Sequence, residues 1–429
     1  MDIAVIGAGA TGLTAGFELT KRGHSVTVYE KSEGPLGGLA SNQTIAGAQI
    51  DKFYHHIFTS DADMISLIDE TGLSRDLMWK DARNGIFSGG RVHPFTSPTD
   101  LLRYRGLSLP GRVRTGLAVL RAKGCRDYRG LEDVSARDWL SANAGRESYD
   151  KLWRPLLDSK FGEDADSVGG VWIWNKFKLR GSTRRGVDAE SLGYLRGGFG
   201  ALYDRLAELI EQGGGRVVRS EAGDISKDAG GGLSLAHGGG RERYERILFT
   251  GSPHELCQAA DLPPEYALRA RSVRYKANIC LTLITARRLS DYYWVTVAER
   301  GAPFVLFIEH SNLFPDPAFG VRGFIFLSRY LDASDPLFAA DERYIADVFF
   351  SYLGGMFPEF TRGEIAQYEV RRARWAQPVV GLRHSERLLP LGTPLEGLYI
   401  ASMSQIYPED RGQNYAVALG RRAAALIGG

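Results

Sequence analysis

The stretch that decides the fold reads DIAVIGAGATG and covers residues 2–12. Its first five residues are mostly apolar and predict a short, buried parallel strand. A G-x-G-x-x-G pattern follows at residues 7–12, and residues 13–22 have the apolar spacing of a helix. Residues 25–29 predict a second strand, and Glu30 stands at its end. Strand, glycines, helix, strand and acid occur in the order of a dinucleotide-binding βαβ unit.

Each glycine of this pattern has a physical reason. The first permits the tight turn, the second lets the backbone approach a pyrophosphate, and the third lets the helix pack closely on the sheet. The pyrophosphate then lies at the helix N-terminus, where free N–H groups favour negative charge, and the acid accepts hydrogen bonds from the ribose. A glycine-rich turn in an unrelated α/β fold is the alternative. The cofactor-binding residues predicted here are Gly7, Gly9, Ala10, Thr11, Gly12 and Glu30.

The composition is that of an ordinary globular protein. The 429 residues are 44% hydrophobic and 24% charged, which allows a large core and two or three domains. Lysine and arginine number 53 against 51 acidic residues, so the charge balance gives no reason to expect nucleic acid as a partner. The eight histidines lack the spacing of metal ligands, and we predict no metal.

Cysteine usage and hydropathy bear on the compartment. Cys125, Cys257 and Cys280 lie far apart and predict reduced thiols in a cytoplasmic setting. No apolar run reaches the length of a transmembrane helix, so membrane contact is expected to be peripheral at most. The oligomeric state is left open.

After Glu30 the chain continues KSEGPLGGLAS, residues 31–41. A glycine pair after the acidic strand end resembles the extended fingerprint of flavin oxidoreductases related to amine oxidases, protoporphyrinogen oxidase and phytoene desaturase. The resemblance implies non-covalently bound FAD, with the Gly-Gly turn close to the flavin and the pyrophosphate. That group often has a basic residue after the pair, where this chain has leucine. The resemblance adds Lys31, Gly37, Gly38, Leu39 and Ala40 to the predicted cofactor site.

A second part of the resemblance lies towards the other end of the sequence. Residues 397–401 predict a strand, and residues 412–424 predict a helix. In the same superfamily such a helix points its N-terminus at the flavin, where its dipole stabilises negative charge on the reduced ring. Ser402-Met403 stands where the family usually has Gly-Asp, and no nearby cysteine offers a covalent link. The predicted flavin contacts here are Gln413, Asn414 and Tyr415.

These segments imply an α/β fold with a Rossmann-type FAD-binding domain interleaved with a mixed-sheet substrate domain and a helical cap. A further segment, LRGGFG at residues 195–200 followed by a helical stretch and a strand, resembles the part of protoporphyrinogen oxidase and phytoene desaturase that extends the FAD sheet. The expected domains are 1–80, 190–255 and 385–429 for FAD, 81–189 for the helical cap, and 256–384 for a mixed α+β substrate domain.

Residues 51–61, DKFYHHIFTSD, predict the reacting end of the site. They resemble both the D-x-G-x-H of the protoporphyrinogen oxidase group, with Phe53 in place of glycine, and the His-Ile-Phe-His-Thr run of UDP-galactopyranose mutase. A histidine at the isoalloxazine would act as acid or base near neutral pH, so we predict catalytic roles for His55 and His56. The alternative is a buried polar pair that the backbone satisfies.

Other candidates come from the cap and the substrate domain. Glu309 and His310 follow an apolar strand and are predicted as a second acid/base pair, with a buried structural network as the competing interpretation. Residues 103–129 hold eight basic residues and one acid, which indicates a mouth for an anionic substrate, a contact with anionic lipid, or a solvated helical face. The predicted substrate-binding residues are Arg91, Trp174, Tyr293, Arg329 and Tyr330.

Three functions remain open from the sequence. The first is an FAD-dependent oxidoreductase that moves a hydride from a C–H bond of a small, possibly anionic, organic substrate to flavin N5. The second is a redox-neutral, flavin-dependent mutase acting on a nucleotide sugar, which the histidine run and available arginines favour. The third is a flavin-binding protein without catalysis. The single G-x-G-x-x-G unit argues against a separate nicotinamide domain, and we expect the oxidoreductase.

Overall fold

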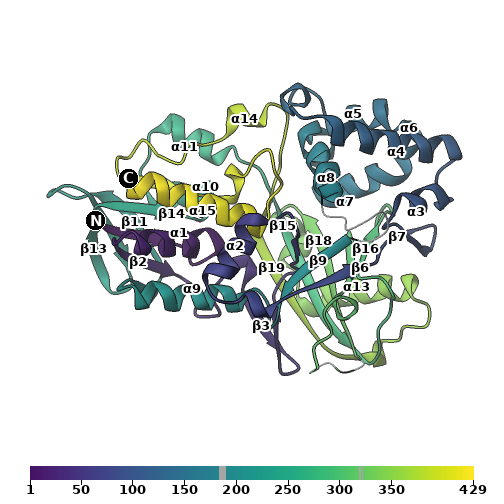
Figure 1. Ribbon diagram of the computed structural model, residues 1–429, viewed down its shortest axis with the longest axis horizontal. Helices are drawn as coiled ribbons and strands as arrows, with labels where there is room; N and C mark the ends of the chain where they lie inside the picture. Colours follow the sequence, from purple (N-terminus) through teal and green to yellow (C-terminus); the bar gives the residue numbers. More distant parts are fainter. Residues whose placement is uncertain (183–189, 318–319, 321) are drawn as a thin grey trace.

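The computed structural model describes residues 1–182, 190–317, 320 and 322–429. Figure 1 shows a sheet-and-helix region that holds both termini, a helical layer beside it, and a second sheet region below that layer. Within the described residues, no helix is both long and apolar enough to cross a membrane.

The first sheet is parallel and carries the glycine-rich turn. Its strand order is β10 (Arg216–Arg219), β2 (Ser25–Glu30), β1 (Asp2–Ile6), β14 (Arg246–Phe249) and β20 (Leu398–Ile400). Residues 2–6 and 25–30 pair in parallel register, as the sequence predicts. Three separated parts of the chain therefore build one sheet, and the carboxyl ends of its strands meet at one edge.

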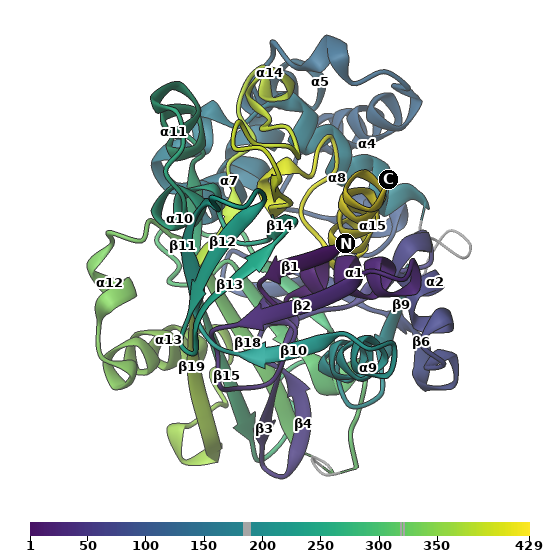
Figure 2. The ribbon, with the colours of Figure 1, turned by 90° about the vertical axis from the view of Figure 1, so that its left-hand side faces the viewer.

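Two different layers cover the faces of this sheet (Figure 2). Ile3 and Val5 point to the helical face, which is covered by α1 (Ala10–Lys21), α9 (Gly200–Gln212) and α15 (Gln413–Gly428). Ala4 and Tyr29 point to the other face, where they pack against a small antiparallel sheet. That sheet consists of β11 (Ala222–Lys227), β12 (Leu233–His237) and β13 (Gly240–Tyr244).

The second large sheet is mixed. Its order is β19 (Ile365–Pro378), β15 (Tyr275–Thr285), β18 (Gly323–Leu331), β17 (Leu306–Glu309), β16 (Trp294–Val297), β7 (Asn84–Ser88) and β8 (Arg91–Pro94). The long β15 is buried along nearly its whole length because β18 and β19 flank it and α13 (Glu342–Met356) packs on the same core.

The helical cap lies above this sheet (Figure 1). It consists of α3 (Pro98–Arg103), α4 (Leu109–Gly124), α5 (Ala136–Asn143), α6 (Arg146–Ser148), α7 (Arg154–Phe161) and α8 (Gly170–Ser182). One apolar cluster, which includes Trp139, Phe161, Trp172 and Phe177, forms its core.

Short elements join the three regions. A hairpin of β3 (Asn42–Ile45) and β4 (Ala48–Asp51) leads into a small sheet of β5 (Ile57–Phe58), β9 (Glu190–Leu195) and β6 (Leu77–Ala82). The Asp51 carboxylate accepts hydrogen bonds from the Tyr194 hydroxyl (2.7 Å) and the Phe199 N–H (3.1 Å). The remaining helices are α2 (Ala62–Glu70), α10 (Pro253–Ala259), α11 (Pro264–Arg271), α12 (Pro336–Ala339) and α14 (His384–Arg387).

The structure places one expected domain boundary differently. From the sequence, residues 81–189 are expected to form the cap, but β7 and β8 extend the substrate sheet through the parallel pairing of β7 with β16. Within the described chain the cap begins at α3 instead, and residues 183–189 of the expected cap lie outside the described residues. A strand pair at the edge of a sheet is ordered by a partner far away in sequence, which local patterns do not reveal.

Candidate active site

The glycine-rich turn has the geometry of a dinucleotide site. Gly7 adopts a φ of +104°, and a Cβ on Gly12 would lie 1.9 Å from the Gly7 carbonyl oxygen, so the close packing of α1 requires glycine there. Gly9 is the N-cap of α1 and offers no side-chain cap, which leaves the first N–H groups of the helix directed at a ligand. The Glu30 carboxylate accepts the Ala8 N–H (2.9 Å) at the edge of the cavity.

The predicted Gly-Gly turn packs directly on this loop. Gly37 and Gly38 have φ values of +109° and +60°, and the Gly37 N–H donates to the Ala8 carbonyl oxygen at 2.9 Å. A Cβ on Gly37 would lie 2.6 Å from the Tyr203 ring, so only glycine allows this approach. Leu39 and Ala40 line the same cavity. Lys31 also lines it and forms an exposed ion pair with Glu255 (3.3 Å).

The start of α15 faces the same cavity from the other side. Its N-cap is Gly412, which has no capping side chain, so the positive end of the helix is available to an anion. Gln413 accepts a short hydrogen bond from the Tyr203 hydroxyl, while its buried side-chain nitrogen has no partner in the described structure. Asn414 accepts the Met64 N–H (3.0 Å) and thereby ties α15 to α2.

One cavity of about 1560 Å³ joins these parts to a chamber under the cap. It runs from Gly9 and Glu30 past the start of α15 to His56, Tyr293 and Tyr330. A helix N-terminus without a side-chain cap at each end, an acid at the second strand, and an unpartnered amide at Gln413 fit an extended dinucleotide with a flavin ring. The residues present therefore fit FAD.

The two predicted histidines both line the chamber. His56 Nδ1 lies 3.0 Å from the Tyr293 hydroxyl, and its ring packs edge-on against Phe58 and Trp294. His55 is partly buried, and the loss of solvation at its ring, followed by the charge of Arg411, lowers its pKa to about 3. His55 is therefore neutral at physiological pH, and its Nδ1 has no partner in the described structure.

Glu309 and His310 lie in the interior of the substrate sheet and do not line the cavity. Glu309 accepts hydrogen bonds from the Ser311 hydroxyl and from the N–H groups of Leu289 and Phe324. Burial raises the pKa of Glu309 to about 7 and lowers that of His310 to about 3. The competing interpretation, a buried structural network, describes Glu309, whereas both ring nitrogens of His310 lack a hydrogen-bond partner among the described residues. A polar pair after an apolar strand has the same sequence pattern in either case.

The predicted substrate residues divide in a similar way. Tyr293 and Tyr330 line the chamber. Trp174 is buried inside the cap, where its indole N–H donates to the Cys125 carbonyl oxygen (3.1 Å). Arg91 is exposed on the β7–β8 hairpin, and Arg329 donates to the Pro303 carbonyl oxygen away from the cavity.

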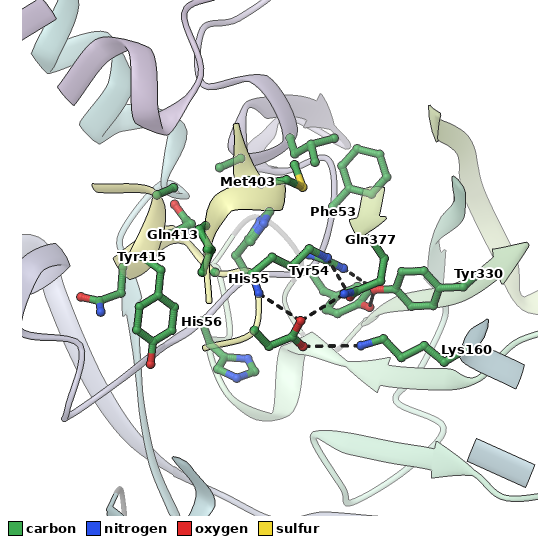
Figure 3. Close-up of a pocket in the computed structure, with 18 of the residues that line it drawn as sticks. Phe53, Tyr54, His55, His56, Lys160, Tyr330, Gln377, Met403, Gln413 and Tyr415 are labelled. Atoms are coloured by element: carbon green, nitrogen blue, oxygen red, sulfur yellow. Dashed lines mark hydrogen bonds and ion pairs between the residues drawn. The ribbon is translucent and has the colours of Figure 1, made fainter. Parts of the chain in front are cut away.

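A polar cluster that the sequence motifs do not reveal lies next to Tyr330. Figure 3 shows Lys160, Gln377 and Tyr330 on one side of the cavity and Gln413 and Tyr415 on the other. Asp410 and Arg411, which precede α15, bind this cluster together. The charged sequence PEDRG, residues 408–412, between a strand and a helix was the available signal.

Fold and site together define an FAD-binding protein. The chain belongs to the family of flavin containing amine oxidoreductases, whose profile matches residues 10–428. Protoporphyrinogen oxidases and zeta-carotene desaturases are also among its relatives, so the resemblance drawn from the fingerprint is confirmed.

Three similar proteins illustrate the range of this fold. AofH of Mycobacterium tuberculosis, a monoamine oxidase-type protein, is 26% identical over 284 residues, 62% of this chain and 61% of AofH. A structure of putrescine oxidase bound to putrescine has 17% identity and a TM-score of 0.75, and covers 99% of this chain and 98% of its own. Reduced UDP-galactopyranose mutase has 15% identity and a TM-score of 0.77, with 99% and 95% covered. At these identities the two structures show the fold alone, and the expected fold class is confirmed.

Proposed function

We propose that the protein oxidises a C–H bond of a small organic substrate, with bound FAD as the hydride acceptor at its N5 atom. The observation that carries this proposal is the single cavity that joins the turn at Gly9 to the chamber at His56 and Tyr330. Its volume of about 1560 Å³ exceeds the roughly 300–1,000 Å³ of common small-molecule sites, so it has room for a dinucleotide and a substrate together.

The chain supplies a proton-transfer group in this chamber. When a hydride leaves a carbon that bears nitrogen or oxygen, the heteroatom loses a proton, which must be accepted. His56 is suited to accept it because imidazole titrates near neutral pH, and the Tyr293 hydroxyl at 3.0 Å fixes the orientation of its ring. Aromatic neighbours such as Trp294 shield the pair from water. His56→Ala would then keep FAD bound but slow its reduction.

A redox-neutral mutase is the second candidate. The stretch His55–Thr59 resembles the corresponding run in UDP-galactopyranose mutase, and a structure of that enzyme shares the fold. Arg371 and Arg411 line the cavity and offer bidentate donors to a diphosphate. A nucleotide-sugar substrate would, in this case, perturb the reduced flavin without net turnover.

The test is an anaerobic screen followed by flavin absorbance. Amines, hydroxy acids, unsaturated lipids and porphyrinogen-like compounds are mixed with the oxidised holoprotein, and nucleotide sugars are mixed with both the oxidised and the reduced forms. Bleaching by one class supports the oxidoreductase. A response to nucleotide sugars confined to the reduced form supports the mutase.

A flavin-free variant provides the control. Gly12→Val introduces a side chain whose Cβ would meet the Gly7 carbonyl oxygen, so it should prevent FAD binding. Gly130→Ala changes a glycine with open space around it and should retain the flavin. Flavin binding in Gly12→Val equal to that of the parent would contradict the assigned cofactor site.

A further inference from the structure

Two lysine side chains converge on one carboxylate inside the cavity, and a third basic side chain, Arg411, lies beside them. The Asp410 carboxylate lies 2.5 Å from Lys176 Nζ and 3.8 Å from Lys160 Nζ, and it accepts a hydrogen bond from the Gln377 side-chain nitrogen (3.0 Å). The exposed fractions of the Asp410 and Lys160 side chains are 6% and 14%, so this ion pair is largely desolvated, while Lys176 is 35% exposed. One carboxylate thus serves two lysines from different helices, α7 and α8.

The guanidinium of the third base, Arg411, hydrogen-bonds to neutral groups, while its backbone N–H donates to the Asp410 carboxylate (3.0 Å). Its guanidinium donates to the Gln377 side-chain oxygen (2.9 Å) and to the Tyr330 hydroxyl (2.6 Å). The Tyr330 hydroxyl in turn lies 2.9 Å from that of Tyr54. The charged groups that act on Lys160 are Asp410, Lys176 and Arg411. The cluster thus has three basic groups and a single acid.

We propose that Lys160, Lys176 and Arg411 form a subsite for an anionic oxygen group of the substrate, a carboxylate or a phosphate. Buried charges are costly unless they are paired, and a second anion would pair the excess bases. Ammonium and guanidinium groups are the usual donors to both kinds of anion. The Trp172 and Tyr330 rings, 5.0 and 5.3 Å from Lys160 Nζ, form the wall of the subsite.

The excess of basic groups in this cluster also disfavours a cationic substrate. A protonated amine would meet like charge beside Lys160, Lys176 and Arg411, although the family is named for amine oxidation. Burial lowers the pKa of Lys160 well below its ordinary value, Asp410 opposes this shift, and Lys176 and Arg411 add to it. An anion in the subsite would return Lys160 to its charged form. This inference rests on the proposed function, because it takes the chamber to be the substrate site.

Binding to the FAD-loaded protein tests the subsite without any knowledge of the substrate. Octanoate, octyl phosphate, octylamine and octanol share one apolar chain, and flavin absorbance together with tryptophan fluorescence reports their binding. At least one anion should bind 10-fold or more tightly than octylamine and octanol. Lys160→Met and Lys176→Met should each weaken that anion 10-fold or more, with FAD affinity unchanged.

Lys178→Met is the matched control, because Lys178 lies on α8 near Lys176 but is exposed over Trp174. The proposal would be overturned if octylamine bound the parent protein more tightly than the anions, if octanol bound as tightly as the anions, or if neither anion bound. All three outcomes are measured on the parent protein alone. Loss of FAD from both lysine variants would instead assign the cluster to the cofactor and also overturn it. Because turnover is not measured, failure of the oxidoreductase proposal would be seen separately in the anaerobic screen.

A second, independent observation concerns α4, whose large apolar residues point outwards. The face buried in the cap consists of small residues, Gly111, Thr115, Ala118 and Ala122. The outer face carries Leu109 (63% exposed), Val113 (45%), Leu117 (47%) and Leu120 (63%), and Leu102 of α3 (51%) joins them. This arrangement reverses that of a surface helix in a globular protein.

The surroundings of these leucines point to their partner. Exposed basic residues flank them, and Asp127 is the one acid in residues 103–129. Leu102, Val113, Leu117 and Leu120 also line the cavity, so the apolar surface continues into the chamber. Leucines surrounded by arginines match an anionic bilayer, where apolar side chains enter the acyl region and cations meet the headgroups. The geometry points to docking of this surface on an anionic membrane, from which an apolar substrate enters the cavity.

Vesicle co-sedimentation tests the docking surface with the holoprotein. Vesicles of phosphatidylcholine with 30% phosphatidylglycerol, a composition of roughly physiological charge, should bind it, and neutral vesicles or high salt should release it. Leu117→Glu/Leu120→Glu should reduce the bound fraction at least fivefold. Leu268→Glu/Leu426→Glu, at exposed leucines elsewhere, should not. Absence of binding, equal loss in both pairs, or a concentration-dependent dimer lost only in the α4 variant would overturn the proposal.

Discussion

At the scale of single residues, Asp51 shows how a buried carboxylate couples the fold to pH. Its side chain is bonded to Tyr194 and Phe199, and burial raises its pKa to about 7 from an ordinary value of 3.8. Between these values the folded protein holds a proton that the unfolded chain releases. The stabilisation is therefore complete below about pH 4 and is lost as the pH rises through 7.

Asp51→Asn should make the stability depend less on pH, because asparagine does not titrate. Each unit of difference between the folded and unfolded pKa corresponds to about 1.4 kcal/mol of stability. The measurement is the melting temperature of the holoprotein between mildly acidic and mildly basic pH, in the parent and the variant. His55 and His310, whose pKa values are lowered, change the stability with pH in the opposite direction. Both proteins contain these histidines, so the difference between the two curves isolates the contribution of Asp51. Parallel curves for the two proteins would contradict the assignment.

The sequence predicts residues well where backbone geometry restricts the residue type. Gly7 lies in a tight turn with a positive φ, and Gly12 lies where α1 approaches the loop closely. Larger side chains are excluded at both positions, so the motif predicts this local structure. Glu309 and His310 show the limit. A polar pair after a strand has the same sequence whether its side chains face a cavity or the interior of a sheet, and only tertiary packing decides between them.

At the scale of elements, the N-terminus of α15 is the feature with the clearest electrostatic consequence. Gly412 caps the helix without a side chain and has an extended φ of −175°, which any residue can adopt. An aspartate there would bind the free N–H groups and place a negative charge beside the flavin. Gly412→Asp should therefore lower the two-electron reduction potential of bound FAD.

The helix-terminus effect of about 0.5–2 kcal/mol corresponds to a fall of roughly 10–40 mV for a two-electron couple. Equilibration with a reference dye during slow reduction measures it. Gly412→Asn is the neutral control, which caps the helix without the charge and should shift the potential much less. An equal shift in both variants would show that the charge is not the cause.

Elements with a strong local signal were the predictable ones. β1, α1 and β2 follow from their periodicity, and α15 follows from a helical pattern beginning at a glycine. The pairing of β7 with β16, which brings the β7–β8 hairpin into the substrate sheet, was not predictable, because it joins residues about two hundred positions apart. The outward leucines of α4 were also missed, since an apolar pattern does not say which side meets the core.

At the scale of the whole molecule, the cavity that fits FAD is assembled from parts that are far apart in the chain. Gly9, Gly37, Thr250 and Gln413 line one cavity, although they come from β1–α1, the Gly-Gly turn, the end of β14 and the start of α15. A ligand that binds the folded chain at this junction, and not the unfolded chain, stabilises the folded state. The gain is about 2.7 kcal/mol when the free ligand concentration is 100 times the Kd.

Removal of FAD should therefore loosen the junction before it unfolds any single sheet. We expect the apoprotein to melt several degrees below the holoprotein and to recover on addition of FAD. Hydrogen exchange should increase most at residues 7–12, 37–41 and 412–416, while β15 in the centre of the substrate sheet stays protected because both its neighbours are in place. A uniform increase in hydrogen exchange across both large sheets would instead mean that FAD stabilises the molecule as one cooperative unit. The FAD-binding domain would then have no stability separate from the substrate domain.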